Sequence, residues 1–105
     1  MSEEYIVIHV SVPDVTVANQ IAHTLLQHKK AACIQILPAM RSLYMWQEQL
    51  EESTEQLLMI KTQSVHFPDV EALVKEHHPY DTPEVIAVPI LAGSQSYLDW
   101  IKDIT

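Results

Sequence analysis

Residues 31–46, with the sequence AACIQILPAMRSLYMW, decide the fold of this chain. Their apolar and β-branched side chains predict a strand over residues 31–37 that resumes over residues 41–46. Proline cannot donate a hydrogen bond to a strand ladder, so Pro38 between the two segments predicts a bulge or an edge position.

The residues that follow turn this strand into an overlong hairpin. The acidic and polar residues 47–53 return the chain into a further strand over residues 54–62. Because this hairpin is longer than the strands predicted elsewhere, part of it has no strand of its own chain to pair with. An exposed edge that carries Tyr44, Met45 and Trp46 would make a monomer prone to aggregation. We therefore predict a homo-oligomer in which a partner subunit covers these residues, and a closed ring does so most economically.

Further elements flank the hairpin on both sides. The apolar periodicity predicts a strand over residues 5–12 and a helix over residues 14–29 that is capped by Asp14. It also predicts a second helix over residues 68–78 that starts near Pro68, a fourth strand over residues 84–90 and a short closing helix over residues 97–104. Pro89 indicates that the fourth strand lies at a sheet edge. The order βαββαβ with a C-terminal helix predicts an α+β fold, a ferredoxin-like sandwich with an antiparallel sheet, in a single domain of residues 1–105.

The composition excludes several classes of function. Fourteen acidic against six basic residues give a net charge of −8, which opposes nucleic-acid binding and favours either cations or simple solubility. A single glycine, Gly93, excludes the glycine-rich phosphate loops of nucleotide-binding proteins. No apolar run reaches the about 20 residues of a membrane helix, and the acidic first residues lack a secretory signal, so we expect a cytoplasmic protein. Cys33 is the single cysteine; it excludes an internal disulfide, and we interpret it as a buried structural thiol in the middle of a strand.

Residues 77–84, with the sequence HHPYDTPE, carry the candidate site. Imidazole and carboxylate groups on a proline-stiffened turn suit borderline divalent metals such as copper and zinc, although adjacent histidines are also common on protein surfaces. Helical phase turns His77 inward, whereas His78 points about 100° away. His77 is then either a hydrogen-bonded histidine at the core margin or, beside Glu84, an inward metal ligand or proton carrier. No pair of nucleophile and base is visible, so we predict no enzymatic activity.

Several short motifs follow one another along the chain: Ala31-Ala32-Cys33, Ser42-x-Tyr44-x-Trp46, Glu55 before Lys61-Thr62, His78-Pro79-Tyr80 with Pro83-Glu84, and Tyr97-x-x-Trp100. As an ordered set they resemble the CutA, or divalent-ion tolerance, family over nearly the whole chain. The resemblance implies a cytosolic homotrimer of ferredoxin-like subunits with interlocking hairpins, copper(II) binding and no established enzymatic activity.

The metal ligands that we expect from this segment and the resemblance are His77, Glu84 and His78. Tyr80 and Lys61 would line the same cleft against a neighbouring subunit. We expect Tyr44, Met45 and Trp46 to form the trimer interface.

Two positions depart from the family pattern. A first-strand cysteine proposed as a copper ligand in some relatives falls at Val10, and a glycine usual after the tryptophan is Glu48, which leaves the form of the local turn open. Without the soft thiol, we expect copper(II) or another divalent cation to be held weakly through nitrogen and oxygen. The alternative is a signalling or protein-interaction trimer that binds a small ligand between subunits and has no metal role.

Overall fold

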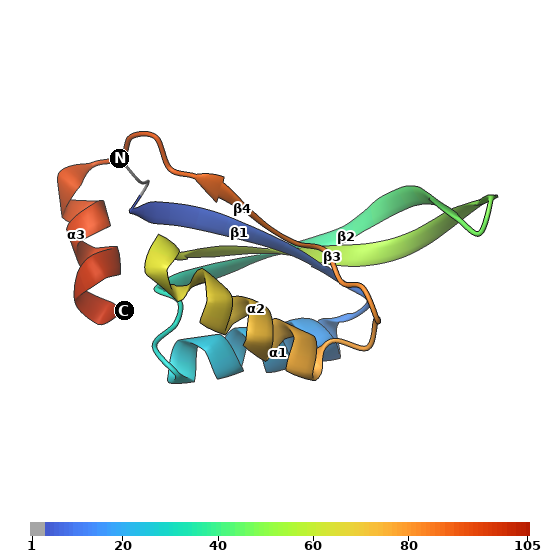
Figure 1. Ribbon diagram of the computed structural model, residues 1–105, viewed down its shortest axis with the longest axis horizontal. Coiled ribbons are helices and arrows are strands. Elements are labelled where there is room, and N and C mark those ends of the chain that lie inside the picture. Colours follow the sequence, from blue (N-terminus) through green and yellow to red (C-terminus); the bar gives the residue numbers. More distant parts are fainter. Residues whose placement is uncertain (1–3) are drawn as a thin grey trace.

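The computed structural model describes residues 4–105, in which one antiparallel sheet carries two helices on one face and a third helix at one end (Figure 1). The strands are β1 (Tyr5–Val12), β2 (Cys33–Trp46), β3 (Gln49–Gln63) and β4 (Val85–Pro89). The helices are α1 (Val15–Gln27), α2 (Phe67–His77) and α3 (Gln95–Ile104), with a 3₁₀ turn, η1 (Ser64–His66), before α2. The antiparallel order β2-β3-β1-β4 is that of the ferredoxin-like βαββαβ sandwich, which confirms the predicted fold class.

The core lies between the sheet and helices α1 and α2. Successive side chains of a strand point to opposite faces, and the even-numbered residues of β1 point to the helices. Each of them is at most 6% exposed, as are their partners from β3 and the helices: Ile6, Ile8, Val10, Val12, Leu58, Ile60, Ile21, Leu25, Val70 and Val74. Asp14 caps α1 as predicted, because its Oδ1 accepts a hydrogen bond from the backbone N–H of Val17 over 2.9 Å. Within residues 4–105, none of the helices has the length and apolarity needed to cross a membrane.

Strands β2 and β4 form the two edges of the sheet. The register between β2 and β3 shifts between Leu37 and Met40, so Pro38 lies at a bulge on an edge strand, as predicted. Pro89 ends the opposite edge strand, β4, which also agrees with the prediction.

The hairpin of β2 and β3 is longer than predicted. Strand β3 begins at Gln49 instead of residue 54, because Gln47 and Glu48 alone make the turn, with φ of 49° and 64°. Two consecutive residues with left-handed φ are what a type I′ hairpin turn requires. The prediction of a polar connection over residues 47–53 was therefore wrong: without Asn or Gly, this pair gives no sequence signal for a two-residue turn.

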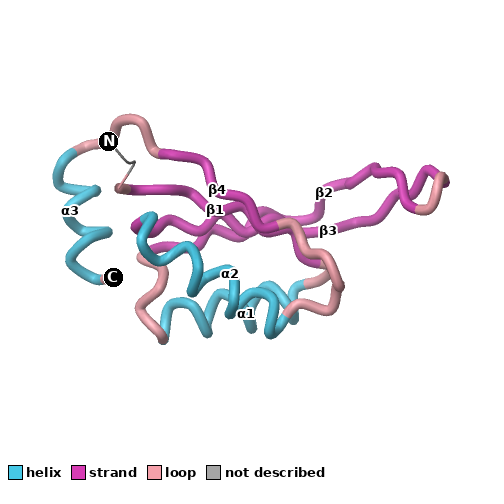
Figure 2. The backbone as a smooth tube through the Cα atoms, viewed as in Figure 1, coloured by secondary structure: helices cyan, strands magenta, loops and turns pink. Residues whose placement is uncertain are grey.

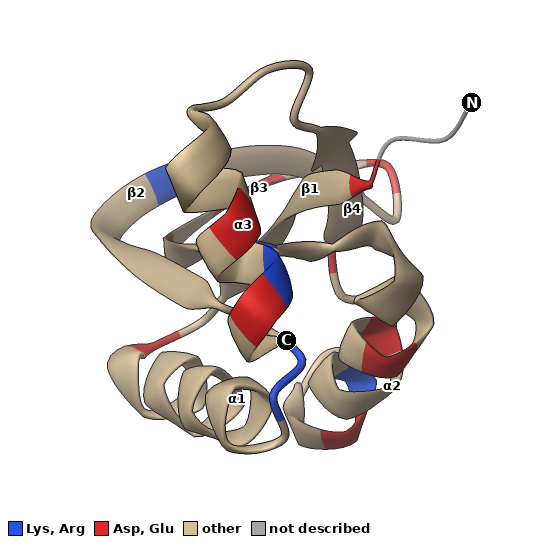
Figure 3. Cartoon of the chain, turned by 90° about the vertical axis from the view of Figure 1, so that its left-hand side faces the viewer, with Lys and Arg blue, Asp and Glu red and all other residues tan. Residues whose placement is uncertain are grey.

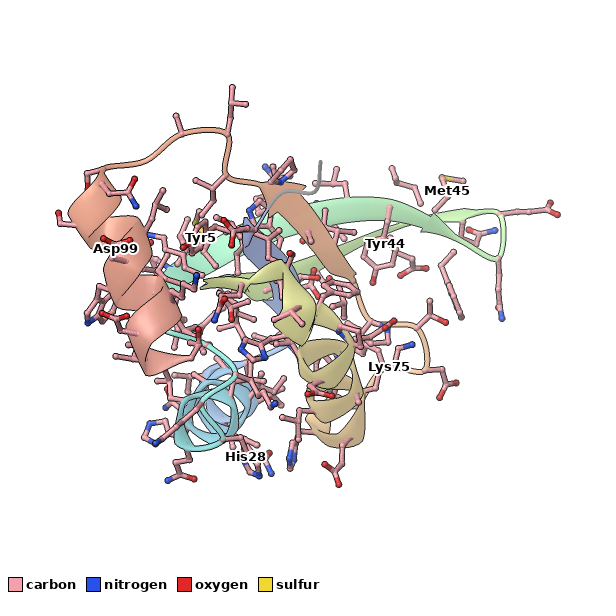
Figure 4. All side chains as sticks on the ribbon, turned by 60° about the vertical axis from the view of Figure 1, so that its left-hand side comes forward. Tyr5, His28, Tyr44, Met45, Lys75 and Asp99 are labelled. Carbon is pink, nitrogen blue, oxygen red and sulfur yellow. The ribbon has the colours of Figure 1, made fainter. Side chains whose placement is uncertain are left out.

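The outer hairpin, residues 40–55, projects beyond the rest of the sheet (Figure 2). Gln56 pairs with the last residue of β1, so β3 residues 49–55 pair with β2 alone. Tyr44, Met45 and Trp46 are 45%, 65% and 61% exposed. Tyr44 and Met45 point to opposite faces of the hairpin (Figure 4). This part of the chain therefore presents large apolar side chains on both of its faces.

Candidate functional site

A groove opens between the outer hairpin and the turn that joins α2 to β4. Its volume is about 790 Å³, and we call it the hairpin groove; it is lined by Ser11, Ser42, Leu43, Tyr44, Trp46, Glu51, Glu55, Tyr80, Asp81, Thr82 and Glu84. Strand alternation explains the contribution of the hairpin, because Ser42 and Tyr44 pair with Ser53 and Glu51 and therefore share one face of the ladder with them.

Glu55 is the buried carboxylate of the hairpin groove. It is 6% exposed, whereas Glu51, Asp81 and Glu84 are all exposed. Its Oε2 accepts a hydrogen bond from the Tyr80 hydroxyl over 3.0 Å. Partial burial, followed by the hydrogen bond to Glu55 and its negative charge, raises the pKa of Tyr80 to about 12. Tyr80 is therefore a proton donor at neutral pH, and it holds the turn against the hairpin.

His78 is the buried imidazole of the turn, at 8% exposed. Its Nε2 donates to the backbone oxygen of Ser11 over 2.8 Å, and its Nδ1 accepts from the backbone N–H of Tyr80 over 3.2 Å. The two rings of His78 and Tyr80 also pack together, with centroids 4.7 Å apart. The hydrogen bonds to Ser11 and from Tyr80 are both satisfied by the neutral His78 ring with its hydrogen on Nε2. In this arrangement His78 positions Tyr80 above Glu55.

Glu84 reaches the hairpin groove from the far end of the turn. Its Oε1 accepts a hydrogen bond from the Ser11 hydroxyl over 3.3 Å. Ser11 is only 6% exposed, so this bond satisfies a buried hydroxyl of β1. Ser11 thus contacts the turn twice, through its backbone oxygen and through its side chain.

His77 lies outside the hairpin groove, against α1. Its Nδ1 is 3.3 Å from Nε2 of Gln20, which donates to it, and its side chain is 24% exposed. The prediction that His77 is the inward imidazole and that His78 turns away was wrong, whereas the other reading of His77, a hydrogen-bonded histidine at the core margin, agrees with its contact to Gln20. Helix α2 ends at His77, and His78 has extended backbone angles, φ −88° and ψ 135°, so helical phase no longer sets its direction. Of the two imidazoles, His78 is the more deeply buried.

Lys61 and Cys33 lie near α3, away from the hairpin groove. They face each other across β2 and β3, and the Lys61 ammonium is 5.6 Å from the ring centroid of Tyr97. Cys33 is the first residue of β2 and is half-buried, which corrects the expectation of a buried thiol in mid-strand. Of the residues expected to share a cleft, the structure thus brings Tyr80 and Glu84 together and leaves His77 and Lys61 outside.

Sequence reasoning gave Ser11, Glu51 and Glu55 no role at a site. The available signal for Glu55 was strand alternation, which puts this carboxylate on the same face of β3 as the apolar Leu57 and Met59. No comparable signal marked Ser11, whose role depends on a turn more than 60 residues away, at His78.

The described part of a single chain offers too few ligands in one place to hold a metal ion well. Within residues 4–105, no three His, Cys, Asp or Glu side chains converge in a way that could hold a metal ion. Zinc and copper sites normally use three or four protein ligands. A cation on this chain would therefore complete its coordination with water or with donors from another copy.

The chain matches known proteins along most of its length. A family model described as CutA1 divalent ion tolerance protein matches residues 6–104. The divalent-cation tolerance protein CutA of Thermus thermophilus is 41% identical over 99 residues, which cover 94% of this chain and 96% of that protein. The chloroplastic protein CutA of Arabidopsis thaliana is 40% identical over 100 residues, which cover 95% of this chain and 55% of that protein.

The fold has a similarly close relative among solved structures. The crystal structure of CutA1 from the psychrotrophic bacterium Shewanella sp. SIB1 superposes with a TM-score of 0.97 at 40% identity, over 100% of this chain and 98% of that one. These matches confirm the family resemblance of the ordered motifs. The chain belongs to the CutA1 divalent ion tolerance family.

Proposed function

We propose that this protein acts in tolerance of divalent cations as a cytoplasmic homotrimer that binds copper(II) weakly and catalyses no reaction. The acidic hairpin groove carries the proposal. Glu84, one of the predicted ligands, stands there with three further carboxylates, and no Lys or Arg is among the described residues that line it. Carboxylate oxygens attract divalent cations, and the net charge of −8 has the same sign as these groups.

Weak binding follows from the available donors. Val10, at the position where some relatives have a cysteine, is fully buried and offers no ligand atom. Half-buried Cys33 lies away from the groove, so the candidate ligands are the borderline nitrogen and oxygen donors of His77 and Glu84. Both ring nitrogens of His78 are already hydrogen-bonded, and His77 lies outside the groove of its own chain, so a metal held by His77 and Glu84 would have to lie between two copies. Such a site prefers copper(II) over zinc, and it loses affinity in mildly acidic solution because imidazole must be unprotonated to bind.

The trimer proposal is supported by the outer hairpin. Strand β2 is an edge strand, and its outer part exposes Tyr44, Met45 and Trp46. Exposed apolar edges are normally covered in soluble proteins, and pairing with identical subunits in a ring covers every edge in the same way.

Titration calorimetry with copper(II) and with zinc tests the metal proposal on the intact protein. We expect weak copper(II) binding, weaker zinc binding, and loss of the copper signal in His77→Ala and in Glu84→Gln. His23→Ala is the matched control, since His23 is an exposed imidazole on α1. Copper binding by His77→Ala equal to that of the unsubstituted protein would overturn the assignment of His77. Absence of binding to both ions would overturn the metal proposal and favour the small-ligand trimer.

A further inference from the structure

We propose that the hairpin groove receives the Lys61 side chain of a second copy of this chain, with the ammonium between Glu51 and Glu55. The surface that docks into the groove is the end of the molecule formed by Lys61 and helix α3. This contact rests on the proposed trimer, and it specifies the two different surfaces that meet around the ring. Asp81 and Glu84 stay outside the ion pair, so they remain available to a metal ion.

The hairpin groove carries negative charge without a cation of its own. Its four carboxylates are Glu51, Glu55, Asp81 and Glu84, and among the described residues no Lys or Arg lines it. Glu55 is buried, and the Tyr80 hydroxyl gives it a hydrogen bond but no positive charge. A buried carboxylate costs free energy unless a positive group lies near it. A cationic side chain from another copy would therefore stabilise the groove.

Lys61 is the cation that suits this role. Basic residues are few along the chain, as Figure 3 shows from the end that carries α3. Three of the six, Lys30, Arg41 and Lys75, form ion pairs, and two more, Lys29 and Lys102, are exposed to solvent. Lys61 is half-buried, and within residues 4–105 its ammonium has no carboxylate partner; it lies 5.6 Å from the ring centroid of Tyr97. Another copy can supply the counter-charge that Lys61 lacks.

Lys61 cannot reach the groove of its own chain. Strand alternation puts Lys61, Glu51 and Glu55 on one face of β3, because all three have odd numbers in a strand without a bulge of its own. At about 3.3 Å per residue, Lys61 lies roughly 33 Å from Glu51 and roughly 20 Å from Glu55 along the strand. Figure 1 shows this separation, with α3 at one end of the sheet and the outer hairpin projecting at the other. Only the Lys61 of another copy can therefore neutralise these carboxylates.

Aromatic side chains flank the charges on both surfaces. Tyr97, beside Lys61, and Trp100 are 37% and 41% exposed, and their ring centroids are 5.5 Å apart. In the groove, Tyr44 and Trp46 lie beside the carboxylates and belong to the proposed subunit contact. Aromatic residues are enriched in the cores of protein interfaces, and the alkyl stem of a lysine packs well against apolar surface. The α3 end therefore presents an aromatic surface whose charge complements that of the groove.

A contact between these two surfaces suits a closed ring. The surfaces differ, so each copy can offer its α3 end to one neighbour and its hairpin groove to the other, in a head-to-tail contact. Such a contact closes into a ring when the rotation between copies completes a circle. Opposite charges also favour this arrangement over one that brings two acidic grooves together, because like charges repel.

Carbodiimide coupling of the intact protein tests the contact directly. The reagent joins a lysine amine to a carboxyl group in contact with it and adds no spacer, and mass spectrometry of a proteolytic digest identifies the joined peptides. We expect an amide between Lys61 and either Glu51 or Glu55. Because these residues lie far apart along one strand, such an amide can form only between two copies.

Charge substitutions measure how much the contact contributes to assembly. Lys61→Glu should raise the dissociation constant of the trimer by about tenfold or more, because like charges then meet in the groove. Sedimentation equilibrium over a dilution series measures this change. Adding Glu51→Lys to Lys61→Glu should restore most of the affinity, since the pair is then reversed. Lys61→Met keeps an apolar stem beside Tyr97 and should also weaken assembly, so it remains informative if Lys61→Glu folds poorly.

Lys29→Glu is the matched control, because it makes the same change of charge at an exposed lysine after α1 and should leave assembly unchanged. Equal weakening by Lys29→Glu overturns the contact, since the effect would then come from net charge alone. A trimer that assembles equally well with Lys61→Glu and Lys61→Met, and gives no cross-link from Lys61 to Glu51 or Glu55, overturns the contact but not the trimer. A folded monomer of the unsubstituted protein overturns both.

Discussion

The hydroxyl of Tyr80 donates a hydrogen bond to Oε2 of Glu55 over 3.0 Å, across 25 residues of sequence. Tyr80 belongs to the turn after α2, and Glu55 lies where β3 leaves the body of the sheet to form the outer hairpin. His78 holds the Tyr80 backbone, and Ser11 joins the same turn to β1. The hairpin and the turn therefore stabilise each other, and the groove between them depends on both.

Tyr80→Phe removes this hydrogen bond and leaves the ring in place. We expect the free energy of unfolding at neutral pH to fall by about 1–3 kcal/mol, because the buried carboxylate of Glu55 loses its donor. Urea unfolding of both proteins measures the difference. An unchanged free energy of unfolding would mean that water satisfies Glu55 equally well.

The same pair predicts a loss of stability in alkali. The pKa of Tyr80 is raised from 10.0 to about 12 in the folded protein. Its contribution to stability is therefore complete below about pH 10 and is lost as the pH rises to about 12. The stability difference between the unsubstituted protein and Tyr80→Phe should shrink over that interval. Tyrosinate absorbance should show one late-titrating tyrosine that is missing from Tyr80→Phe; a late titration in the variant would assign it to another residue.

The two adjacent imidazoles should differ sharply in their effect on stability. Both ring nitrogens of the buried His78 are hydrogen-bonded, so His78→Ala should cost about 1–3 kcal/mol of unfolding free energy. His77→Ala should cost less than about 1 kcal/mol, since His77 has one side-chain hydrogen bond, to Gln20 of α1, and a longer 3.8 Å approach to the exposed Glu76. Urea unfolding of the two variants under identical conditions provides the comparison. Equal losses of unfolding free energy would show that the hydrogen bonds of His78 contribute no more to stability than the contacts of His77.

The outer hairpin should control assembly. We expect sedimentation equilibrium to give a mass three times that of the 12.0 kDa chain. Replacing Tyr44, Met45 and Trp46 together by serine should yield a smaller species, because the apolar surface that favours association is gone. Val65→Ser, at an apolar residue of η1 that is 73% exposed, is the control and should leave the mass unchanged. A folded monomer of the unsubstituted protein would overturn the trimer proposal.

The cap of α1 offers a purely local test. Asp14→Ala should reduce the free energy of unfolding by about 0.5–2 kcal/mol, because the N–H of Val17 loses its acceptor. Asp14→Ser should retain most of the stability, since a serine hydroxyl can cap the same group. Thermal unfolding of the two variants distinguishes loss of the cap from a general effect of substitution at Asp14.

Much of the fold could be predicted from local pattern alone. Alternation in β1, the cap at Asp14, and the prolines at 38 and 89 each depend on residues close in sequence, and each agrees with the structure. The exception was the turn at Gln47 and Glu48, where two residues without a strong turn preference adopt left-handed φ. Pairing along the flanking strands holds them there, and sequence periodicity does not report that constraint.

The candidate site could be predicted only in part. Its segment, residues 77–84, follows from the clustering of imidazole and carboxylate groups, and Tyr80 and Glu84 do reach the groove. The error over His77 and His78 arose where helical phase ends, because one change of backbone angle redirects the side chain.

By itself, the sequence determined the order of strands and helices, the core face of β1 and the family, because these depend on periodicity and short motifs. The tertiary structure alone decided which polar groups meet. Ser11 bonds to His78 across 67 residues and to Glu84 across 73, and Glu55 gains its donor from Tyr80. Such contacts depend on how the chain brings the turn after α2 against β1 and the hairpin, and this three-dimensional packing leaves no regular spacing in the sequence.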